Sequence, residues 1–379
     1  MKRFFALVLC TLLLSGCGGE EPPAPEASTP PAVSVEREET PPPVEIIEPD
    51  PIQDLLDAMT VEEKVGQLFF VRCPAENAAE DVAAYHLGGY ILFGRDTKDK
   101  TAGALIEDIA SYQAAADIPL LIGVDEEGGT VVRVSSNPHL RSAKFQSPQK
   151  VGLDNAASDT AEKDRLLAAL GFNVNLAPVA DLSTDPNDFI YARSFGQDAE
   201  QTSRYVAAVV EQMRDDGMGS VLKHFPGYGN NVDTHTGIAL DTRPLEQFMA
   251  EDFLPFEAGL TAGGETTAVL VSHNIVEAMD PQLPASLSPA VHEMLRDELG
   301  FTGVIMTDDL AMEAVAAYAG DGSAAVMALE AGNDLIITTD HRTQIPKVME
   351  AVESGALELE TIESACRNVL EWKQALGLI

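Results

Sequence analysis

The stretch Gly219-Ser220-Val221-Leu222-Lys223-His224-Phe225-Pro226-Gly227 joins a short apolar run to a cation, an imidazole and a Pro-Gly turn. The apolar run is typical of a buried strand, and the Pro-Gly turn ends regular strand pairing. We therefore expect Lys223 and His224 to project from the end of a strand rather than from a helix face. Barrel enzymes carry their catalytic residues at such strand ends.

Eight apolar runs recur along the chain, and stretches of helical periodicity separate them. The runs are residues 67–71, 90–93, 120–124, 174–176, 220–222, 268–271, 304–306 and 335–337. The clearest helical stretches are residues 102–115, 202–214, 245–262, 311–331 and 359–376. Apolar strands separated by helix-length connections indicate a parallel sheet covered on both faces. We predict a single α/β domain over residues 51–379, a (β/α)8 TIM-type barrel, with an open doubly wound sheet as the alternative.

The composition is that of a large globular protein with a strongly acidic surface. The chain has 379 residues, 45% of them hydrophobic, which is enough for one large core. Its 61 acidic and 24 basic residues give a formal charge of -37. A charge of this sign repels phosphates, so nucleic acid is not an expected partner.

The N-terminus has the pattern of an export signal. Lys2 and Arg3 precede an apolar run over residues 4–14, which is too short to span a bilayer as a helix. The run ends in Leu14-Ser15-Gly16-Cys17, which resembles a bacterial lipobox. We predict a lipoprotein signal peptide at residues 1–16 and a lipid on Cys17; an ordinary secretory signal is the alternative. Either alternative implies an exported protein, and the lipid would hold it on the extracytoplasmic side of the cell membrane.

Residues 17–50 are rich in Pro, Glu, Ser and Ala and are predicted to form a disordered tether. A chain of this length and composition would reach roughly 30 to 100 Å. With Cys10 and Cys17 assigned to the signal and the lipid, only Cys73 and Cys366 remain, and no Cys-x-x-Cys spacing occurs. We therefore expect neither a disulfide framework nor a cysteine-based zinc site.

Polar residues follow five of the predicted strands. They are Asp125-Glu126-Glu127-Gly128-Gly129, Asp181, Lys223-His224, His273 and Asp308-Asp309. One such residue alone is often a helix cap, and Asp309 fits that role because it leads into Leu310-Ala311-Met312. Five strand ends that open onto one face of a barrel instead predict an active site.

Retaining glycoside hydrolysis is one chemistry that fits these residues. A carboxylate attacks the anomeric carbon while a second group protonates the leaving oxygen. Histidine suits that proton transfer near neutral pH. In Asp233-Thr234-His235 the carboxylate is close enough in sequence to orient the imidazole and to stabilise its charged form.

Five motifs together resemble glycoside hydrolase family 3, in its β-N-acetylglucosaminidase (NagZ-like) branch. They are Val124-Asp125-Glu126-Glu127-Gly128-Gly129, Arg193-Ser194-Phe195-Gly196, Lys223-His224-Phe225-Pro226-Gly227, Asp233-Thr234-His235 and Thr307-Asp308-Asp309-Leu310-Ala311-Met312. The resemblance runs from about residue 65 to residue 378, with the motifs in the family's order.

The resemblance implies a role for each matching residue. Asp308 matches the family's nucleophile, His235 its general acid/base and Asp233 the supporting carboxylate. The residues that match sugar-binding positions are Asp125, Arg133, Arg193, Lys223 and His224. Charged side chains suit sugar hydroxyls because they can make two hydrogen bonds at once.

The chain departs from the family pattern at three places. Tyr228 stands where the family usually has another histidine, and Thr130 replaces an arginine after the paired glycines. The segment between Gly229 and Asp233 is one residue shorter than in common members. The first and third of these differences affect the loop that carries His235.

A metal-dependent amidohydrolase barrel is an alternative, because His224, His273 and Asp308 would suit its ligand positions. That class needs a His-x-His pair after the first strand, where this chain has Val71-Arg72-Cys73-Pro74. We therefore predict no metal and no organic cofactor.

Three further alternatives for the function stay open if the protein binds a sugar. One is another family 3 glycosidase, although the β-glucosidase branch takes its acid from a second domain. Another is a phosphorylase, because a neutral histidine tolerates an incoming phosphate better than a carboxylate does. The third, from a different class, is a non-catalytic sugar-binding lipoprotein.

The sequence thus predicts an exported, lipid-anchored, retaining exo-β-N-acetylglucosaminidase (β-N-acetylhexosaminidase). The expected mechanism passes through a covalent glycosyl-aspartate intermediate. The expected partner is a carbohydrate that contains N-acetylglucosamine. Peptidoglycan or its muropeptide fragments are the first candidate, and chitin oligosaccharides and glycoprotein glycans are the others.

Overall fold

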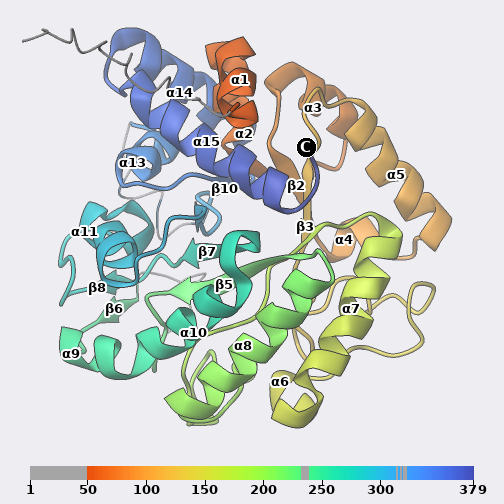
Figure 1. Cartoon of the computed structure of the whole chain (residues 1–379), viewed down its shortest axis with the longest axis vertical. Helices are drawn as coiled ribbons and strands as arrows, with labels where there is room; N and C mark the ends of the chain where they lie inside the picture. The colour runs from red at the N-terminus through yellow and green to blue at the C-terminus, as the bar shows by residue number, and fades with distance from the viewer. Residues whose placement is uncertain (1–48, 232–238, 313–314, 316–317, 319–321) are drawn as a thin grey trace, which may run out of the picture. The chain divides into compact units, whose positions relative to one another are not determined.

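The structure, a computed structural model, describes residues 49–231, 239–312, 315, 318 and 322–379. Asp50–Ile379 form one compact unit. Figure 1 shows helices on all sides of the central sheet of this unit. The predicted signal peptide, the predicted lipid site at Cys17 and nearly all of the predicted tether lie outside the described residues.

Eight parallel strands form the central sheet. They are β1 (Phe69–Arg72), β2 (Gly89–Leu92), β3 (Leu121–Val124), β4 (Val174–Asn175), β5 (Gly219–Phe225), β7 (Thr267–Val271), β9 (Ile305–Thr307) and β10 (Ile336–Thr338). Their order in the sheet is β10-β1-β2-β3-β4-β5-β7-β9. Each of the eight predicted apolar runs coincides with one of these strands.

The two ends of the sheet meet, so the sheet is a barrel. Met306 in β9 bridges to Leu335, the residue before β10, and the Thr307 backbone N–H donates to the Leu335 carbonyl at 3.2 Å. On its other side β10 pairs with β1, in the register Phe69 to Ile336. The predicted (β/α)8 barrel is confirmed, and the open doubly wound alternative is wrong.

Helices cover the outside of the barrel. The main ones are α1 (Pro51–Ala58), α2 (Val61–Gln67), α3 (Ala78–Tyr85), α5 (Ala102–Ala114), α7 (Ala156–Leu170), α8 (Ala199–Asp215), α10 (Phe253–Gly263), α13 (Ala324–Glu330), α14 (His341–Ser354) and α15 (Leu359–Ala375). The shorter helices are α4 (Gly94–Thr97), α6 (Pro148–Val151), α9 (Leu245–Gln247) and α11 (Pro289–Glu293). The predicted helices 102–115, 202–214 and 359–376 correspond to α5, α8 and α15.

Two of the predicted helices differ from the structure in detail. The predicted helix 245–262 is interrupted by a π-helical turn, Phe248–Asp252, between α9 and α10. The predicted single helix 311–331 is wrong, because Ala311 lies in a turn and the described chain is not helical at residues 322–323. The Ser323 side chain accepts a hydrogen bond from the backbone N–H of Val326 and so begins a new helix, α13.

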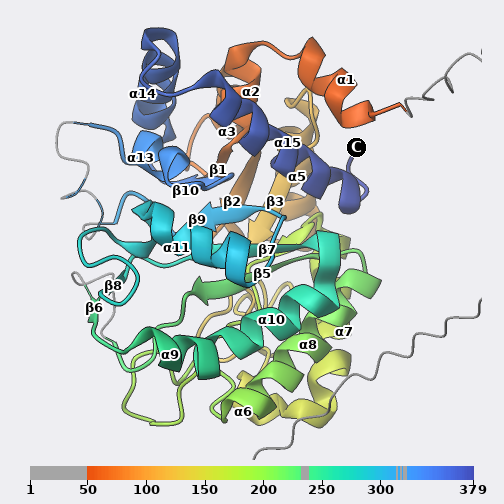
Figure 2. The same cartoon turned by 60° about the vertical axis from the view of Figure 1, so that its left-hand side comes forward.

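The C-terminal helix α15 closes the end of the barrel at which the strands begin. Its side chains donate hydrogen bonds to residues that precede three strands: Trp372 to the Thr266 carbonyl, Asn368 to Asp334, and Lys373 to Gln67. Figures 1 and 2 both show α15 beside α1 and α2. The opposite end, where the strands finish, is left for a binding site.

In the barrel interior, the ring of Phe70 packs over two glycines. A Cβ atom at Gly123 would lie 2.5 Å from the Phe70 ring, and one at Gly89 would lie 2.9 Å from it. Glycine at these two positions in β2 and β3 therefore makes room for the Phe70 ring.

An irregularity at the end of β5 changes the direction of its side chains. The pairing of β5 with β7 shifts between Lys223 and Phe225. Consecutive residues of a regular strand face opposite sides, whereas both Lys223 and His224 line one cavity here. A separate two-stranded parallel sheet, β6 (Leu240–Asp241) with β8 (Ile275–Val276), lies beyond this end of the barrel strands.

Both remaining cysteines are free and buried. Burial raises the pKa of the Cys73 and Cys366 thiols to about 12. In the ranges that the structure describes, every helix is too short or too polar to cross a lipid bilayer.

Candidate active site

A cavity of about 700 Å³ lies at the end of the barrel where the strands finish. Its charged and polar lining residues are Arg72, Asp125, Arg133, Arg193, Lys223, His224, Asp308, Asp309 and Thr339. Its floor includes apolar side chains such as Leu176 and Leu270. A larger cleft of about 880 Å³ lies beside α15, at the opposite end of the barrel, and contains none of the predicted site residues. The cavity above the strand ends is therefore the candidate active site.

Lys223 stands at the centre of the charged side chains. Its Nζ donates to Asp125 Oδ1 at 2.7 Å and lies 2.6 Å from Glu127 Oε1. Its side chain is only 2% exposed. A buried ammonium group needs such partners because charge is costly away from water. Asp125 and Glu127, which follow β3, thus position a lysine from β5.

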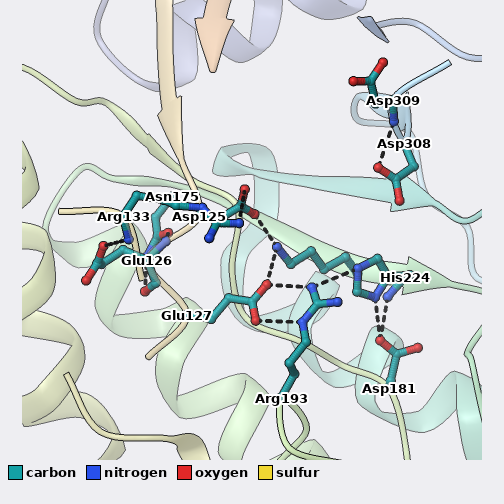
Figure 3. Close-up of polar contacts among 11 residues, drawn as sticks. Asp125, Glu126, Glu127, Arg133, Asn175, Asp181, Arg193, His224, Asp308 and Asp309 are labelled. Carbon is teal, nitrogen blue, oxygen red and sulfur yellow. Dashed lines mark hydrogen bonds and ion pairs between the residues drawn. The ribbon is translucent and has the colours of Figure 1, made fainter. Parts of the chain in front are cut away.

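Glu127 also holds Arg193 in a two-point contact, which Figure 3 shows. Arg193 Nε donates to Glu127 Oε2 at 3.0 Å and Nη2 donates to Oε1 at 2.7 Å. Burial alone would raise the pKa of Glu127, but the charges of Arg193 and Lys223 outweigh burial and hold this pKa well below its usual range. Burial alone would likewise lower the pKa of Arg193, and the Glu127 charge raises it instead. Both groups are therefore charged at neutral pH.

His224 is oriented by a buried carboxylate. Asp181 Oδ2 lies 2.7 Å from His224 Nδ1 and also accepts the backbone N–H of His224 at 3.0 Å. On the other side of the ring, His224 Nε2 lies 3.2 Å from Arg193 Nη2. Arginine only donates, so Nε2 accepts and the proton sits on Nδ1. A sugar hydroxyl group that donates a hydrogen bond to Nε2 would have to replace the contact with Arg193.

Tyr228 packs its ring edge-on against His224, with the ring centroids 5.2 Å apart. Its backbone N–H donates to Asp181 Oδ1 at 2.7 Å. The residue that departs from the family pattern is therefore part of the support of His224.

Residues 232–238, which include Asp233 and His235, lie outside the described residues, and the described residues on either side of them make polar contacts. Arg243 binds Asp241 and Asp252 and donates to the Gly227 carbonyl. Asn231 donates to Asp241 Oδ2 at 2.6 Å. Burial raises the pKa of Asp252 to about 6, although Arg243 opposes this shift. These contacts join the described residues that precede the segment to those that follow it.

Asp308 and Asp309 follow β9 and have different surroundings. Asp308 Oδ1 accepts the backbone N–H of Asp309 at 2.7 Å, and Asp308 lines the cavity. Asp309 Oδ1 accepts from the backbone of Ala311, and its Oδ2 accepts from Thr339 Oγ1 at 2.6 Å. Figure 3 shows the two carboxylates pointing in opposite directions. Asp309 thus binds the turn that follows it and Thr339, and no helix of the described residues begins at it.

His273 is engaged in the core rather than in the cavity. Its Nε2 lies 3.2 Å from the Asp309 carbonyl and its Nδ1 lies 2.7 Å from Ser286 Oγ. Because both ring nitrogens are engaged, His273 does not fit the role of a metal ligand that the amidohydrolase alternative requires. Within the described ranges, the group with metal-ligand spacing is Glu63, His86 and Asp117, which precede strands rather than follow them.

The structure brings six of the sequence-predicted residues to one cavity. They are Asp125, Arg133, Arg193, Lys223, His224 and Asp308. Asp233, His235 and Cys17 lie outside the described residues. Sequence reasoning did not assign a role to Glu127, although the quoted motif after strand three contains it. It noted Asp181 at a strand end without linking it to His224.

The chain matches the family model "Glycosyl hydrolase family 3 N terminal domain" over residues 60–372. A match over this share of the chain shows that it belongs to glycosyl hydrolase family 3. The resemblance noted in the motifs is therefore confirmed at the level of the family.

Curated relatives cover most of the chain. A β-hexosaminidase of Stenotrophomonas maltophilia is 33% identical over 301 residues, which are 77% of this chain and 88% of that protein. The β-hexosaminidase LpqI of Mycobacterium tuberculosis is 32% identical over 336 residues, which are 83% of each protein.

Solved structures have the same fold. A family 3 β-N-acetylglucosaminidase of Paenibacillus superposes with a TM-score of 0.76 at 31% identity, over 85% of this chain and 63% of that longer chain. A β-N-acetylhexosaminidase of Beutenbergia cavernae superposes with a TM-score of 0.74 at 28% identity, over 84% of this chain and 99% of that chain.

The shared carboxylate Glu127 yields a testable prediction about stability. We expect Glu127→Gln to cost about 3–5 kcal/mol at pH 7, because two cations then lose a buried partner. The folded pKa of Glu127 lies below its unfolded value, so its contribution is present above about pH 4.3 and is lost as the pH falls further. The difference in unfolding free energy between wild type and variant should therefore shrink below that pH in urea titrations.

The matched control is Glu107→Gln on the exposed face of α5. It should change the unfolding free energy by less than about 0.5 kcal/mol at every pH. A Glu127→Gln penalty that is the same at pH 3 as at pH 7 would contradict the assignment.

Proposed function

We propose that the chain is a retaining exo-β-N-acetylglucosaminidase, which removes terminal N-acetylglucosamine from the non-reducing end of a glycan. The observation that carries this proposal is a cavity that Asp308 lines together with Asp125, Lys223 and Arg193. Lys223 forms ion pairs with Asp125 and Glu127, and Glu127 also binds Arg193. The names of the relatives, β-hexosaminidase and β-N-acetylglucosaminidase, support it. A cavity of this size suits a small polar ligand such as a sugar ring.

In the proposed first step, an Asp308 oxygen forms a bond to the anomeric carbon. The bond from that carbon to the leaving oxygen breaks, and its electron pair stays on the oxygen. The leaving oxygen takes a proton from the His235 imidazolium, which Asp233 orients and stabilises. The product is a covalent glycosyl-aspartate and a released alcohol.

In the proposed second step, neutral His235 takes a proton from water while the water oxygen attacks the anomeric carbon. Asp308 leaves as a carboxylate, and two inversions give overall retention. Phosphate in place of water would make the enzyme a phosphorylase. We favour hydrolysis because the relatives carry the names of hydrolases.

The charged cluster is proposed to hold the N-acetylglucosamine ring. Asp125, Lys223 and Arg193 offer fixed acceptors and donors for sugar hydroxyl groups, and Arg133 lines the same cavity. The ion pair of Lys223 with Asp125 and those of Lys223 and Arg193 with Glu127 preorganise these groups, so little side-chain entropy is lost when sugar binds. His224 is proposed to contribute through its contact with Arg193.

We also propose that the enzyme is exported and held at the membrane by lipid on Cys17, where peptidoglycan and its fragments would be at hand. The lipobox-like Leu14-Ser15-Gly16-Cys17 and the Pro/Glu-rich segment after it support this proposal. Chitin oligosaccharides and glycoprotein glycans are the other candidate substrates.

Asp308→Asn should reduce turnover of aryl N-acetylglucosaminides by at least about 10³-fold while the thermal unfolding midpoint changes little, because the amide cannot form the glycosyl ester. Stopped assays measure the turnover, and thermal melts measure the unfolding midpoint, for wild type and Asp308→Asn. Asp309→Asn is the control for the neighbouring carboxylate and should keep more activity. Wild type that binds N-acetylglucosamine without turning over any substrate would make the protein a sugar-binding lipoprotein instead.

His235→Ala should lower kcat/KM for unactivated disaccharides far more than for nitrophenyl glycosides. A nitrophenolate leaves without protonation, whereas a sugar alkoxide does not. A gap of about 10²-fold between the two losses is expected. Equal losses on both substrates would exclude the acid/base role.

Cys17→Ala should move the protein from the membrane fraction to the soluble fraction of the bacterial cell envelope or medium, because the thiol that carries the lipid is gone. Metabolic labelling with a fatty acid should mark the wild type only. Labelled Cys17→Ala protein, or unlabelled wild type, would refute the lipid anchor.

A further inference from the structure

Three side chains of the kinds that bind metal ions lie together at the end of the barrel where the strands begin. They are Glu63 in α2, His86 directly after α3, and Asp117 between α5 and β3. One ligand atom of each residue lies within 4.8 Å of those of the other two. Each residue precedes a different strand, β1, β2 or β3, and these strands are neighbours in the sheet. The group therefore joins three successive helix-to-strand connections.

The spacing of the ligand atoms suits a single shared ion. His86 Nδ1 lies 3.7 Å from Asp117 Oδ2, which is longer than a hydrogen bond. Two ligand atoms that each lie about 2.1 Å from one zinc ion are about 3 to 4 Å apart, depending on the angle between them. Small side-chain rotations would therefore bring all three residues around one ion.

The backbone of His86 is fixed beside the face of α2 that carries Glu63. Gln67 Nε2 donates to the His86 carbonyl at 2.8 Å. Gly66 allows this close approach, because a Cβ atom there would lie 2.6 Å from the same carbonyl oxygen. Glu63 lies one helical turn before Gln67, so the two residues share one face of the helix. The side chain of His86 thus starts next to Glu63.

The other two ligand-type residues are also positioned by hydrogen bonds. Asp117 belongs to a loop that Gln113 holds, because Gln113 Nε2 donates to the Leu120 carbonyl at 3.0 Å and its Oε1 accepts the Leu120 backbone N–H at 2.8 Å. Glu63 Oε2 accepts the backbone N–H of Thr60 at 2.7 Å. A carboxylate keeps further lone pairs for a metal ion when it accepts such a bond. The loop and the helix that carry the two carboxylates are therefore in place before an ion binds.

A cavity of about 190 Å³ adjoins the group, and all three residues line it together with apolar side chains such as Leu55, Val82 and Ile118. Apolar surroundings strengthen the attraction between an ion and its ligands. Asp117 itself is exposed, so water can reach the group and complete the coordination of an ion. The group thus lies at the edge of a water-poor space and not on an open acidic surface.

The types of ligand favour zinc over the common alkaline-earth ions. Two carboxylates and a neutral imidazole carry two negative charges, which one divalent cation balances. Calcium and magnesium prefer oxygen ligands, whereas zinc binds imidazole and carboxylate groups together. The formal charge of -37 also attracts cations to this protein at long range.

We propose that Glu63, His86 and Asp117 bind one zinc ion, with water as the remaining ligand, and that this ion ties together the connections before β1, β2 and β3. The candidate active site lies at the other end of the barrel, beyond the last residues of the strands. The zinc ion would therefore stabilise the fold and take no part in the proposed reaction. The proposal does not depend on the proposed glycosidase activity.

Zinc titration of the full chain, first freed of metal with a chelator, tests the proposal by comparison with His86→Asn. Asparagine adopts a positive φ readily, so it suits the φ of 51° at this position and the variant should fold. In calorimetry, wild type should bind one more zinc ion per chain than His86→Asn does. Counting this difference excludes any zinc that binds in the catalytic cavity.

Thermal unfolding provides a second readout. At a zinc concentration about one hundred times the dissociation constant, zinc should raise the wild-type midpoint by about 4 °C more than the midpoint of His86→Asn. Asp117→Asn should bind this zinc ion at least about 10-fold more weakly, because even residues that only support a metal ligand contribute that much to affinity.

Two controls and a diffraction experiment show whether the effect is specific. His139→Asn removes an exposed histidine elsewhere and should bind zinc as wild type does. Calcium at the same concentration should not produce the wild-type shift, because calcium prefers oxygen ligands. Crystals soaked in zinc should show an anomalous peak about 2.1 Å from a ring nitrogen of His86.

Equal zinc stoichiometry and equal midpoint shifts in wild type and His86→Asn would overturn the proposal. An equal response to calcium would also overturn it, because it would indicate nonspecific attraction to acidic groups. Soaked crystals without an anomalous peak among the three residues would do the same. None of these results bears on the turnover of N-acetylglucosaminides, so the glycosidase assignment stands or falls separately.

Discussion

The candidate site depends on one buried carboxylate, Glu127, which binds Arg193 and Lys223 at the same time. Without its charge, two cations from different parts of the barrel would repel each other in a poorly solvated space. With it, both cations are fixed, and Arg193 in turn reaches His224. Strands three and five and the segment after strand four are thereby joined into one rigid, charged surface against which a sugar can be held.

The barrel separates this surface from the elements that stabilise the fold. Helix α15 binds residues before β1, β7 and β10 at one end, and the cavity lies beyond the last residues of the strands at the other. Asp125, Lys223 and Asp308 lie in a strand or directly after one, so their geometry follows from the barrel. The proposed nucleophile, Asp308, is placed in this way directly after β9. Arg133 and Arg193 come from loops instead.

Much of the fold could be predicted from the sequence, because eight apolar runs with helical stretches between them leave few other architectures. The cavity could be predicted as well, because the polar motifs follow strands whose ends share one face. The role of Glu127 could not be predicted, because nothing in the sequence distinguishes it from its acidic neighbours Asp125 and Glu126. In the structure Glu126 accepts backbone N–H groups of residues 133–135, whereas Glu127 binds side-chain cations.

The surroundings of Arg72 could not be predicted from the sequence either. Its place at the end of the first strand was visible in the sequence, where it only argued against a His-x-His metal pair. That it lacks an anionic partner among the described residues depends on which carboxylates approach it in space, and this is a property of the packed barrel. The helix predicted over residues 311–331 failed for a local reason, because Ser323 starts a new helix after a break.

The central claim is that Asp308 forms the covalent bond to the sugar, and trapping that bond tests it most directly. Wild-type protein incubated with an activated 2-fluoro glycoside and digested should yield one peptide whose mass has increased by the mass of the fluorosugar. Fragmentation should place the sugar on Asp308. A label on Asp309 or on another carboxylate, or an active enzyme that never accumulates a labelled peptide, would contradict the claim.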